Sequence, residues 1–160
     1  MTQPVDRPPL LVANGWSIYA HDLFARTLIG LQREVTALKA ADPAGYLSHP
    51  KARILRRVDE LLRIEIPADP GHPKFRLGNT LGPENRGWAR AKFLGRFRLF
   101  FRFSTARKAI IVCWLNDENT LRKAGSRTDP YVVFKDMLLS GNPPPDWDAL
   151  FAAVRRQEPP

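Results

Sequence analysis

Residues 88–103, WARAKFLGRFRLFFRF, decide the fold of this chain. Side chains of a β-strand point alternately to its two faces, so the second half of this stretch separates into a basic set and an apolar set. The basic set is Arg96, Arg98 and Arg102. The apolar set is Phe97, Leu99, Phe101 and Phe103. The pattern predicts a strand whose apolar face belongs to the core and whose basic face binds an anion.

The first half of the stretch shows the same alternation and indicates a hairpin. Trp88, Arg90 and Lys92 share one face. A three-residue loop at residues 93–95, with Gly95 in the left-handed conformation of a G1-bulge turn, keeps the two basic sets on a common face. This register pairs Lys92 with Arg96, Arg90 with Arg98 and Trp88 with Phe100. The sequence therefore predicts a continuous basic patch.

The charge of this region has a single sign. Eight basic residues and no acidic residue lie between Asn85 and Asn116, and they account for nearly all of the formal net charge of +9. Like charges that face each other on a sheet cost about 0.2–1 kcal/mol per pair, so folding alone does not favour this arrangement. Binding of a polyphosphate favours it. The alternative is a solvated face of an antiparallel sheet, although such faces usually carry both signs.

Length and composition narrow the class of protein. A chain of 160 residues fits one domain, residues 1–160, which buries about 70% of its unfolded surface. The single cysteine, Cys113, excludes an internal disulfide, and its apolar surroundings indicate a buried, inert thiol. The histidines stand far apart, so we expect no metal site and no cofactor. No apolar run approaches the ~20 residues of a membrane span, and we expect a cytoplasmic protein.

The segments before the hairpin read as a strand and two helices. A short strand at residues 16–19 precedes a helix from residue 23 to about residue 39. A second helix begins at Pro50, a favoured first position, and runs to about residue 65. Residues 67–87 are rich in proline and glycine and predict a long connection.

The segments after the hairpin read as a strand and two shorter helices. The apolar run at residues 109–115 predicts a central strand that is covered on both faces. Thr128-Asp129-Pro130 begins a helix that ends near Gly141, and Asp146 caps a last helix through about residue 154.

These elements predict an α+β domain, with a small antiparallel sheet, helices packed on one face and a basic, partly open concave face. Residues 1–13 and 156–160 are expected to be flexible tails.

Several spaced motifs resemble one protein family. They are Asn14-Gly15-Trp16 with Tyr19-Ala20-His21, the basic hairpin, Trp114-x-Asn116-Asp117-Glu118-Asn119-Thr120-Leu121-Arg122, and Gly141-x-Pro143-Pro144-x-Asp146-Trp147. In this order they closely resemble the YhaV toxins of bacterial toxin–antitoxin pairs, over residues 14–147. The resemblance implies a RelE-like fold, endoribonuclease activity on messenger RNA, often on the ribosome, and growth arrest. It also implies a PrlF-like antitoxin as partner.

The resemblance and the residue chemistry indicate the same surface as the active site. In RelE-like ribonucleases the site is the concave sheet face, and the resemblance places its basic residues at Arg90, Lys92 and Arg98. Metal-independent cleavage drives the ribose 2′-hydroxyl onto the adjacent phosphorus, and negative charge builds on the phosphorane oxygens. Arginines suit that charge because they are planar and stay protonated. We assign Arg90, Arg98 and Arg96 to this clamp, and Lys92 to the role of base, acid or plain electrostatic contributor.

Further residues are candidates for RNA contact or proton transfer, each with a structural alternative. His21 has the chemistry of a proton carrier, although a helix cap or a core hydrogen bond explains it more simply. Trp88 and Phe100 either stack bases or pack together across the hairpin. Arg122 and Asn119 either reach the mouth of the groove or serve capping and solvation. The remaining cations expected to attract phosphate are Arg102, Arg107 and Lys108.

Phe97 and Phe103 occupy hairpin positions where tyrosine, a proton carrier of many RelE-like sites, would fit, and in the predicted register both point to the core.

Two other functions fit the same arginines. The first is a non-catalytic module of the same fold that binds RNA or the ribosome without cutting it. The second is a patch that serves only an acidic antitoxin. Salt-sensitive binding to bare RNA would argue against the second.

Overall fold

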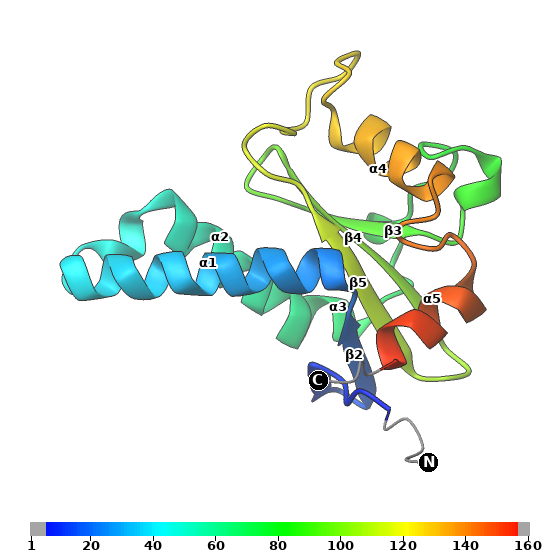
Figure 1. The fold of residues 1–160 in the computed structure, drawn as a ribbon, viewed down its shortest axis with the longest axis horizontal. Coiled ribbons are helices and arrows are strands. Elements are labelled where there is room, and N and C mark those ends of the chain that lie inside the picture. Colours follow the sequence, from blue (N-terminus) through cyan, green and yellow to red (C-terminus); the bar gives the residue numbers. More distant parts are fainter. Residues whose placement is uncertain (1–5, 157–160) are drawn as a thin grey trace.

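The computed structural model describes residues 6–156, which form a five-stranded sheet with helices on both faces (Figure 1). The strands are β1 (Leu11–Ala13), β2 (Trp16–Ala20), β3 (Ala89–Phe93), β4 (Phe97–Ser104) and β5 (Ala109–Leu115). The helices are α1 (Asp22–Ala41), α2 (Pro50–Glu60), α3 (Ile66–Ala68), α4 (Pro130–Leu139) and α5 (Trp147–Arg155). No helix in this part of the chain has both the length and the apolar character that crossing a membrane requires.

The strand order is β1-β2-β5-β4-β3, and β5 lies in the middle, as its unbroken apolar sequence predicts. β2 and β5 run parallel, while the other neighbouring pairs are antiparallel. The prediction of an antiparallel sheet was therefore wrong for one pair. The physical reason is α1, which connects β2 to the rest of the chain and lets the later β5 lie beside β2 in the same direction.

One face of the sheet packs against α1 and α2. This core contains Ile18 and Val112 from the strands, Phe24 from α1 and Val58 from α2. Beyond the sheet, α1 and α2 run side by side as a long helical arm (Figure 1). α2 continues through a π-helical turn, Leu61–Glu65, into α3. The predicted end of the second helix, near residue 65, thus falls within a continuous helical segment.

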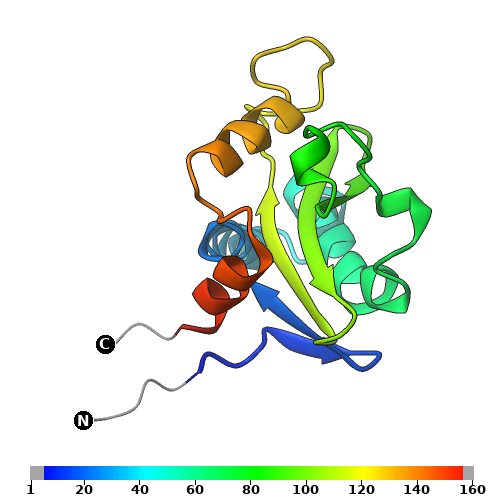
Figure 2. The same ribbon diagram turned by 90° about the vertical axis from the view of Figure 1, so that its right-hand side faces the viewer.

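The opposite face packs against α4 and α5 (Figure 2). Phe134 of α4 stacks on Phe100 of β4, with 4.3 Å between ring centroids, and lies edge-on to Trp88 at 5.1 Å. Leu150 and Val154 of α5 complete this second core. The prediction that helices cover one face only, leaving the basic face partly open, was wrong. The reason is Phe100, an apolar side chain on that face, whose removal from water is favourable and is achieved by the packing of α4.

Local sequence signals explain where the helices begin. The Asp129 side chain accepts a hydrogen bond from the Tyr131 backbone N–H, and Pro130 occupies the first turn of α4. Asp146 accepts from the Ala149 N–H and starts α5. His21 caps α1 in the same way, through Nδ1 and the Leu23 N–H. The first two caps confirm what the sequence predicts.

The β3–β4 hairpin differs from the predicted register. The loop comprises residues 94–96, so that Lys92 pairs with Arg98 and Arg90 pairs with Phe100. Gly95 has the predicted positive φ, 77°, but Leu94 also has a positive φ, 44°. The rings of Phe93 and Phe97 stack at the end of the ladder, with 5.6 Å between centroids, and this contact favours the observed closing pair.

The N-terminal segment that was expected to be a tail contains β1, which pairs with β2. The Arg7 N–H also donates to the Arg155 carbonyl at 2.7 Å, which joins the two ends of the described chain. The other parts of the predicted tails, residues 1–5 and 157–160, lie outside the described residues.

We expect Phe134→Ala to reduce the free energy of unfolding by about 3–5 kcal/mol, because the truncation leaves a cavity between α4 and the sheet. Val132→Ala is the matched control on the same helix, since Val132 is 43% exposed, and its effect should stay within about 0.5 kcal/mol. Urea unfolding followed by circular dichroism measures both. Equal losses in the two variants would show that α4 does not anchor the sheet face.

Candidate active site

The hydroxyl of Tyr131 joins two of the predicted clamp residues. Tyr131 lies in the first turn of α4, and its oxygen accepts hydrogen bonds from Nε of Arg90 at 2.9 Å and from Nε of Arg98 at 3.0 Å. Arg90 comes from β3 and Arg98 from β4, so the contact ties the helix to both strands of the hairpin. The two guanidinium groups are thereby held at one point above the sheet.

Each of these arginines uses its Nη1 group in the same way. Nη1 of Arg98 donates to the carbonyls of Gly95 and Phe97, at 2.9 and 2.8 Å. Nη1 of Arg90 donates to the carbonyls of Lys74 and Arg76, at 3.1 and 3.0 Å. Within residues 6–156, Nη2 of either arginine makes no hydrogen bond. Both guanidinium groups are fixed by the protein yet keep donors for a ligand.

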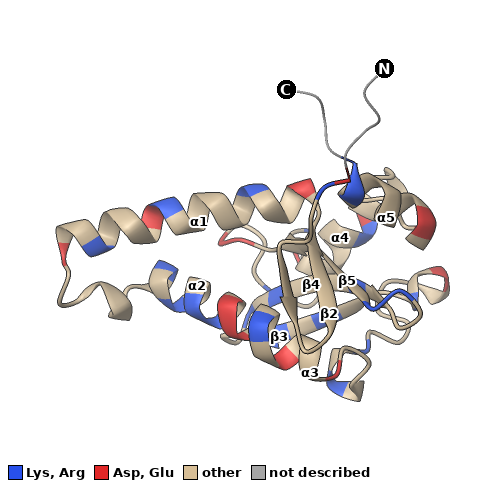
Figure 3. Cartoon of the chain, turned by 90° about the horizontal axis from the view of Figure 1, so that it is seen from below, with Lys and Arg blue, Asp and Glu red and all other residues tan. Residues whose placement is uncertain are grey.

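The charges of this pair are not balanced within the part of the chain that the structure describes. Among the described carboxylates, none forms an ion pair with Arg90 or Arg98, although the Arg98 residue is only 7% exposed. Neutral carbonyl and phenol oxygens satisfy hydrogen bonds but leave the net charge uncompensated. Burying such a charge costs free energy, which an external anion would offset. Figure 3 shows that Lys and Arg on α1 and α2, in contrast, are accompanied by Asp and Glu.

Arg122, from the loop after β5, and Arg96, from the β3–β4 loop, border the same group. The Arg122 guanidinium carbon lies 4.9 Å from the centre of the Tyr131 ring, and its Nη1 donates to Asp129 at 2.6 Å. Arg96 is exposed, and its Nε donates to the Arg122 carbonyl at 3.0 Å. Arg122 therefore has an internal counter-ion, which the sequence pattern did not predict, whereas Arg96 has none among the described residues.

Asn116 holds this loop against the hairpin. Its Nδ2 donates to the carbonyls of Arg96 and Thr120, and its Oδ1 accepts from the Arg98 backbone N–H at 2.7 Å. Asn119 lies in the adjacent turn, where its N–H donates to Asp117. This contact uses the backbone of Asn119, so both alternatives for its side chain stay open.

Lys92 is exposed and lies opposite Arg98 across the two strands. The remaining basic candidates lie elsewhere. Arg107 and Lys108 are exposed in the turn between β4 and β5, over the rings of Phe151 and Trp16. The structure thus brings Lys92 to the arginine pair but leaves the turn cations at the other end of β4.

Trp88 and Phe100 lie in the core that α4 covers. Trp88 is 2% exposed and Phe100 is fully buried, so neither ring offers a face to a nucleobase. Of the two alternatives for these rings, packing is the one the structure shows. Phe97 and Phe103 pack against the core of the opposite face, as the alternation predicts.

Arg102 forms a second, separate basic position on the same sheet face. Its guanidinium carbon lies 5.7 Å from the centre of the Trp88 ring, and Nη1 donates to the Pro145 carbonyl. Burial lowers the pKa of Arg102, and the nearby Asp146 carboxylate opposes this. The stacked rings of Phe100 and Phe134 lie between this position and Tyr131, so the predicted continuous patch is divided into two parts.

His21 is not brought to the arginines. It is buried at the start of α1, where Nδ1 accepts from the Leu23 N–H at 3.2 Å, and its charged neighbours are Asp22, Arg26 and Arg7. Burial lowers the pKa of His21, while Asp22 opposes this. These contacts favour the capping alternative over proton transfer.

Tyr131 is the member of this cluster that the sequence analysis missed. The motif Thr128-Asp129-Pro130 indicates a helix start, and Tyr131 follows directly. In the sequence, Tyr131 is marked only as a polar aromatic residue at the start of a helix, followed by apolar residues. That signal does not say which charged residues the hydroxyl meets.

Residues 18–155 match the family model described as a toxin with endonuclease activity, of a toxin–antitoxin system. The protein is thus of the endonuclease toxin class. "Toxin YhaV" of Escherichia coli O6:H1 is 47% identical over 139 residues, which cover 86% of this chain and 90% of that protein. "Ribonuclease toxin YhaV" of Escherichia coli K12 is 46% identical over the same share of both chains. The chain belongs to the YhaV toxin family. No solved structure matches it significantly.

We expect His21→Asn to weaken the acid sensitivity of the fold while keeping the cap, because asparagine also caps helices. Since burial lowers the pKa of His21, the unfolded chain binds this proton more readily than the folded chain. The stability that neutral His21 supplies is therefore present above the ordinary pKa of about 6.5 and is lost as the pH falls below it. Urea unfolding at pH 7.5 and 5.5 should show a smaller loss in the variant. An equal or larger loss would contradict this assignment.

Proposed function

We propose that this protein is a metal-independent endoribonuclease that cleaves messenger RNA through attack of a ribose 2′-hydroxyl on the adjacent phosphate. The observation that carries the proposal is the pair of guanidinium groups held by one phenol oxygen, with no described carboxylate to neutralise them. The family description of endonuclease activity and the relative named a ribonuclease toxin support an enzyme rather than a binding module.

The arginine pair would stabilise the charge that develops during cleavage. When the 2′-oxygen attacks phosphorus, two negative charges build on the non-bridging oxygens. In a guanidinium group the N–H of Nε and one N–H of Nη2 point in the same direction. Because Nε of each arginine binds the Tyr131 oxygen, a phosphate oxygen on Nη2 would lie beside that hydroxyl. Donors held in place before the reaction are effective because they need no rearrangement when charge appears.

Tyr131 would donate the proton that the leaving oxygen needs. Its oxygen already accepts from Arg90 and Arg98, so its own O–H is directed elsewhere and remains available. In the proposed step the 2′-oxygen forms a bond to phosphorus and the bond from phosphorus to the 5′-oxygen breaks. Tyr131 protonates that 5′-oxygen. The products are a 2′,3′-cyclic phosphate and a 5′-hydroxyl end.

The proton of the 2′-hydroxyl passes to a base. Lys92 keeps both roles assigned to it from the sequence, as that base or as a charge that attracts the RNA. Arg96, exposed beside the pair, would hold a flanking phosphate, and Arg107 and Lys108 would attract the RNA from a distance.

The biological setting is a further part of the proposal. The family implies an antitoxin as partner, and we propose that this antitoxin is PrlF-like and that the toxin acts in the cytoplasm on translated messenger RNA, arresting growth. The RelE-like relationship of the fold is likewise proposed. It rests on the resemblance of the motifs and on the position of Arg90, Lys92 and Arg98 on one face of the hairpin.

We expect Arg90→Ala to slow cleavage about 100- to 1,000-fold, the usual effect of removing one donor to a developing oxyanion. Arg33→Ala on α1 is the matched control, because Arg33 is exposed and its side chain makes no described hydrogen bond or ion pair. Bare RNA with a chelator and RNA in a translation extract should both be used, and the ends mapped chemically. Unchanged cutting by Arg90→Ala, in a variant that unfolds like the parent, would refute the clamp.

We expect Tyr131→Phe to slow cleavage about 100- to 10,000-fold, as the loss of a general acid does. A substrate with sulfur in place of the leaving 5′-oxygen tests the role, since a thiolate departs without protonation. The sulfur substrate should restore fast cleavage by Tyr131→Phe but not by Arg90→Ala. Failure of the sulfur substrate to rescue Tyr131→Phe would mean that the hydroxyl only positions the arginines.

A further inference from the structure

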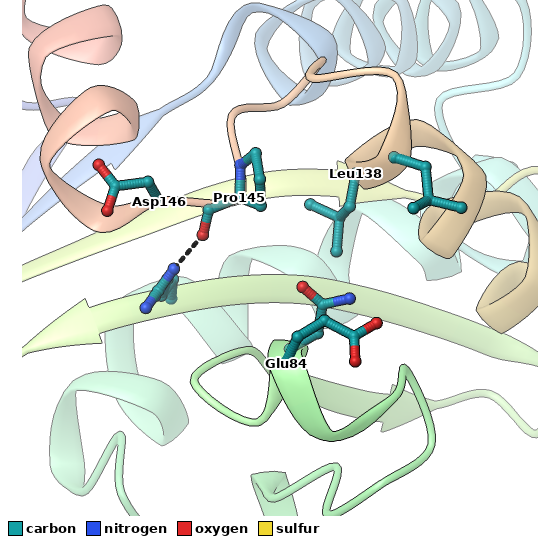
Figure 4. A pocket seen from close by; sticks show the side chains of 7 residues that line it. Glu84, Leu138, Pro145 and Asp146 are labelled. Carbon is teal, nitrogen blue, oxygen red and sulfur yellow. Dashed lines mark hydrogen bonds between the residues drawn. The ribbon is translucent and has the colours of Figure 1, made fainter.

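A pocket of about 390 Å³ surrounds Arg102 on the far side of the Phe100–Phe134 stack (Figure 4). Its walls come from the turn Pro83–Asn85, from β4, from the end of α4 and from the loop before α5. The lining residues are Glu84, Asn85, Arg102, Leu138, Leu139, Pro145 and Asp146. The pocket lies on the same sheet face as the arginine pair, and nothing in the proposed cleavage step uses it.

The charges of this pocket differ from those around Tyr131. One guanidinium group and two acidic residues, Glu84 and Asp146, line the pocket, so the lining does not favour a phosphate. Yet Arg102 forms no ion pair among the described residues, and the same is true of Glu84. Charged groups without an ion-pair partner beside apolar walls suit a neutral ligand that carries both donors and acceptors.

The free groups of the pocket are well defined. Nη1 of Arg102 donates to the Pro145 carbonyl, which leaves Nε and Nη2 without a described partner. Gly87 makes room for this guanidinium, because a β-carbon there would lie 2.8 Å from Nη2. The Glu84 carboxylate makes no described hydrogen bond, and Leu138 lies near it with Pro145 farther along the wall (Figure 4). The pocket thus offers donors from Arg102, acceptors from Glu84 and an apolar wall.

We propose that this pocket binds a nucleobase of the RNA near the cleaved bond and that Arg102 and Glu84 together select guanine. This inference rests on the proposed function, since it assumes an RNA substrate. Guanine presents the acceptors O6 and N7, which arginine binds through two hydrogen bonds. It also presents the donors N1–H and N2–H, which a carboxylate binds in the same paired way. Adenine and the pyrimidines present only part of this set.

The spacing of the two positions fits a base and a phosphate of one strand. Arg98 and Arg102 are four residues apart on the same face of β4, which corresponds to about 13 Å. A short piece of single-stranded RNA can span that distance over the Phe100–Phe134 stack. The phosphate would then lie at the uncompensated arginine pair, and the base would lie where the carboxylates balance Arg102.

Binding of uncleavable RNA tests the inference separately from catalysis. The probes are short oligouridylates with 2′-O-methyl groups throughout, carrying guanine, inosine, 7-deazaguanine or adenine at one position, which is moved along the strand. Fluorescence anisotropy gives the dissociation constants. The full-length protein should bind guanine at one position about tenfold or more tighter than adenine, the usual discrimination of a paired contact. Inosine, which lacks the N2 amine, should fall between them.

Variants assign the preference to its residues. Glu84→Gln should abolish the difference between guanine and inosine, and Arg102→Lys should abolish the difference between guanine and 7-deazaguanine. Asp136→Asn is the matched control, because Asp136 is exposed, makes no described ion pair and does not line the pocket. It should leave every ratio unchanged. Absence of a guanine preference at all positions, or a preference that survives both pocket variants, would overturn the inference.

The unmodified oligonucleotides report on the proposed function. Cleavage without base preference would preserve the nuclease and remove the guanine pocket. A guanine preference in binding, with no cleavage of these oligonucleotides or of RNA in a translation extract, would preserve the pocket and count against the nuclease.

Discussion

The Tyr131 hydroxyl is the contact on which the rest of the site depends, because it accepts from two cations that would otherwise repel each other. Two guanidinium groups on neighbouring strands gain nothing from their proximity alone. The partial negative charge on the shared hydroxyl oxygen reduces the repulsion between them. Four backbone carbonyls fix their orientation. The same hydroxyl anchors α4 over the hairpin. The packing of α4 and the placement of the two cations therefore depend on each other.

Burial strengthens this arrangement electrostatically. In water two exposed arginines are screened, but on a sheet face covered by α4 their field acts through a less polarisable medium. Within residues 6–156, neutral oxygens are the groups that accept from the pair. Asp129, next to Tyr131 in the chain, accepts instead from Arg122 and from two backbone N–H groups. The remaining positive potential is therefore directed to whatever anion approaches. An anion that binds here offsets the free-energy cost of burying the two cations, and this contributes to its affinity.

The sequence predicted which face of the sheet each side chain occupies better than it predicted which residues contact each other. Alternation in residues 96–103 correctly separated the arginines from the core phenylalanines, because the two-residue period is a property of the strand itself. The register was wrong by two residues, a shift that keeps every side chain on its face, so the pattern could not detect it. The helix start at Asp129 and Pro130 was also predictable from local chemistry. That α4 crosses the basic face, and that Tyr131 meets Arg90 and Arg98, depend on packing between segments more than 30 residues apart.

The division of the basic face by the Phe100–Phe134 stack also has chemical consequences. A uniform row of arginines would attract phosphates equally along its length and could not fix which bond lies at the reactive groups. Here the apolar stack separates the pair Arg90 and Arg98 from Arg102, which lines one pocket with Glu84 and Asp146. The potential therefore changes along β4 from strongly positive to nearly balanced. A single strand of RNA, which alternates charged phosphates with neutral bases, gains most when its phosphate meets the first position and a base meets the second.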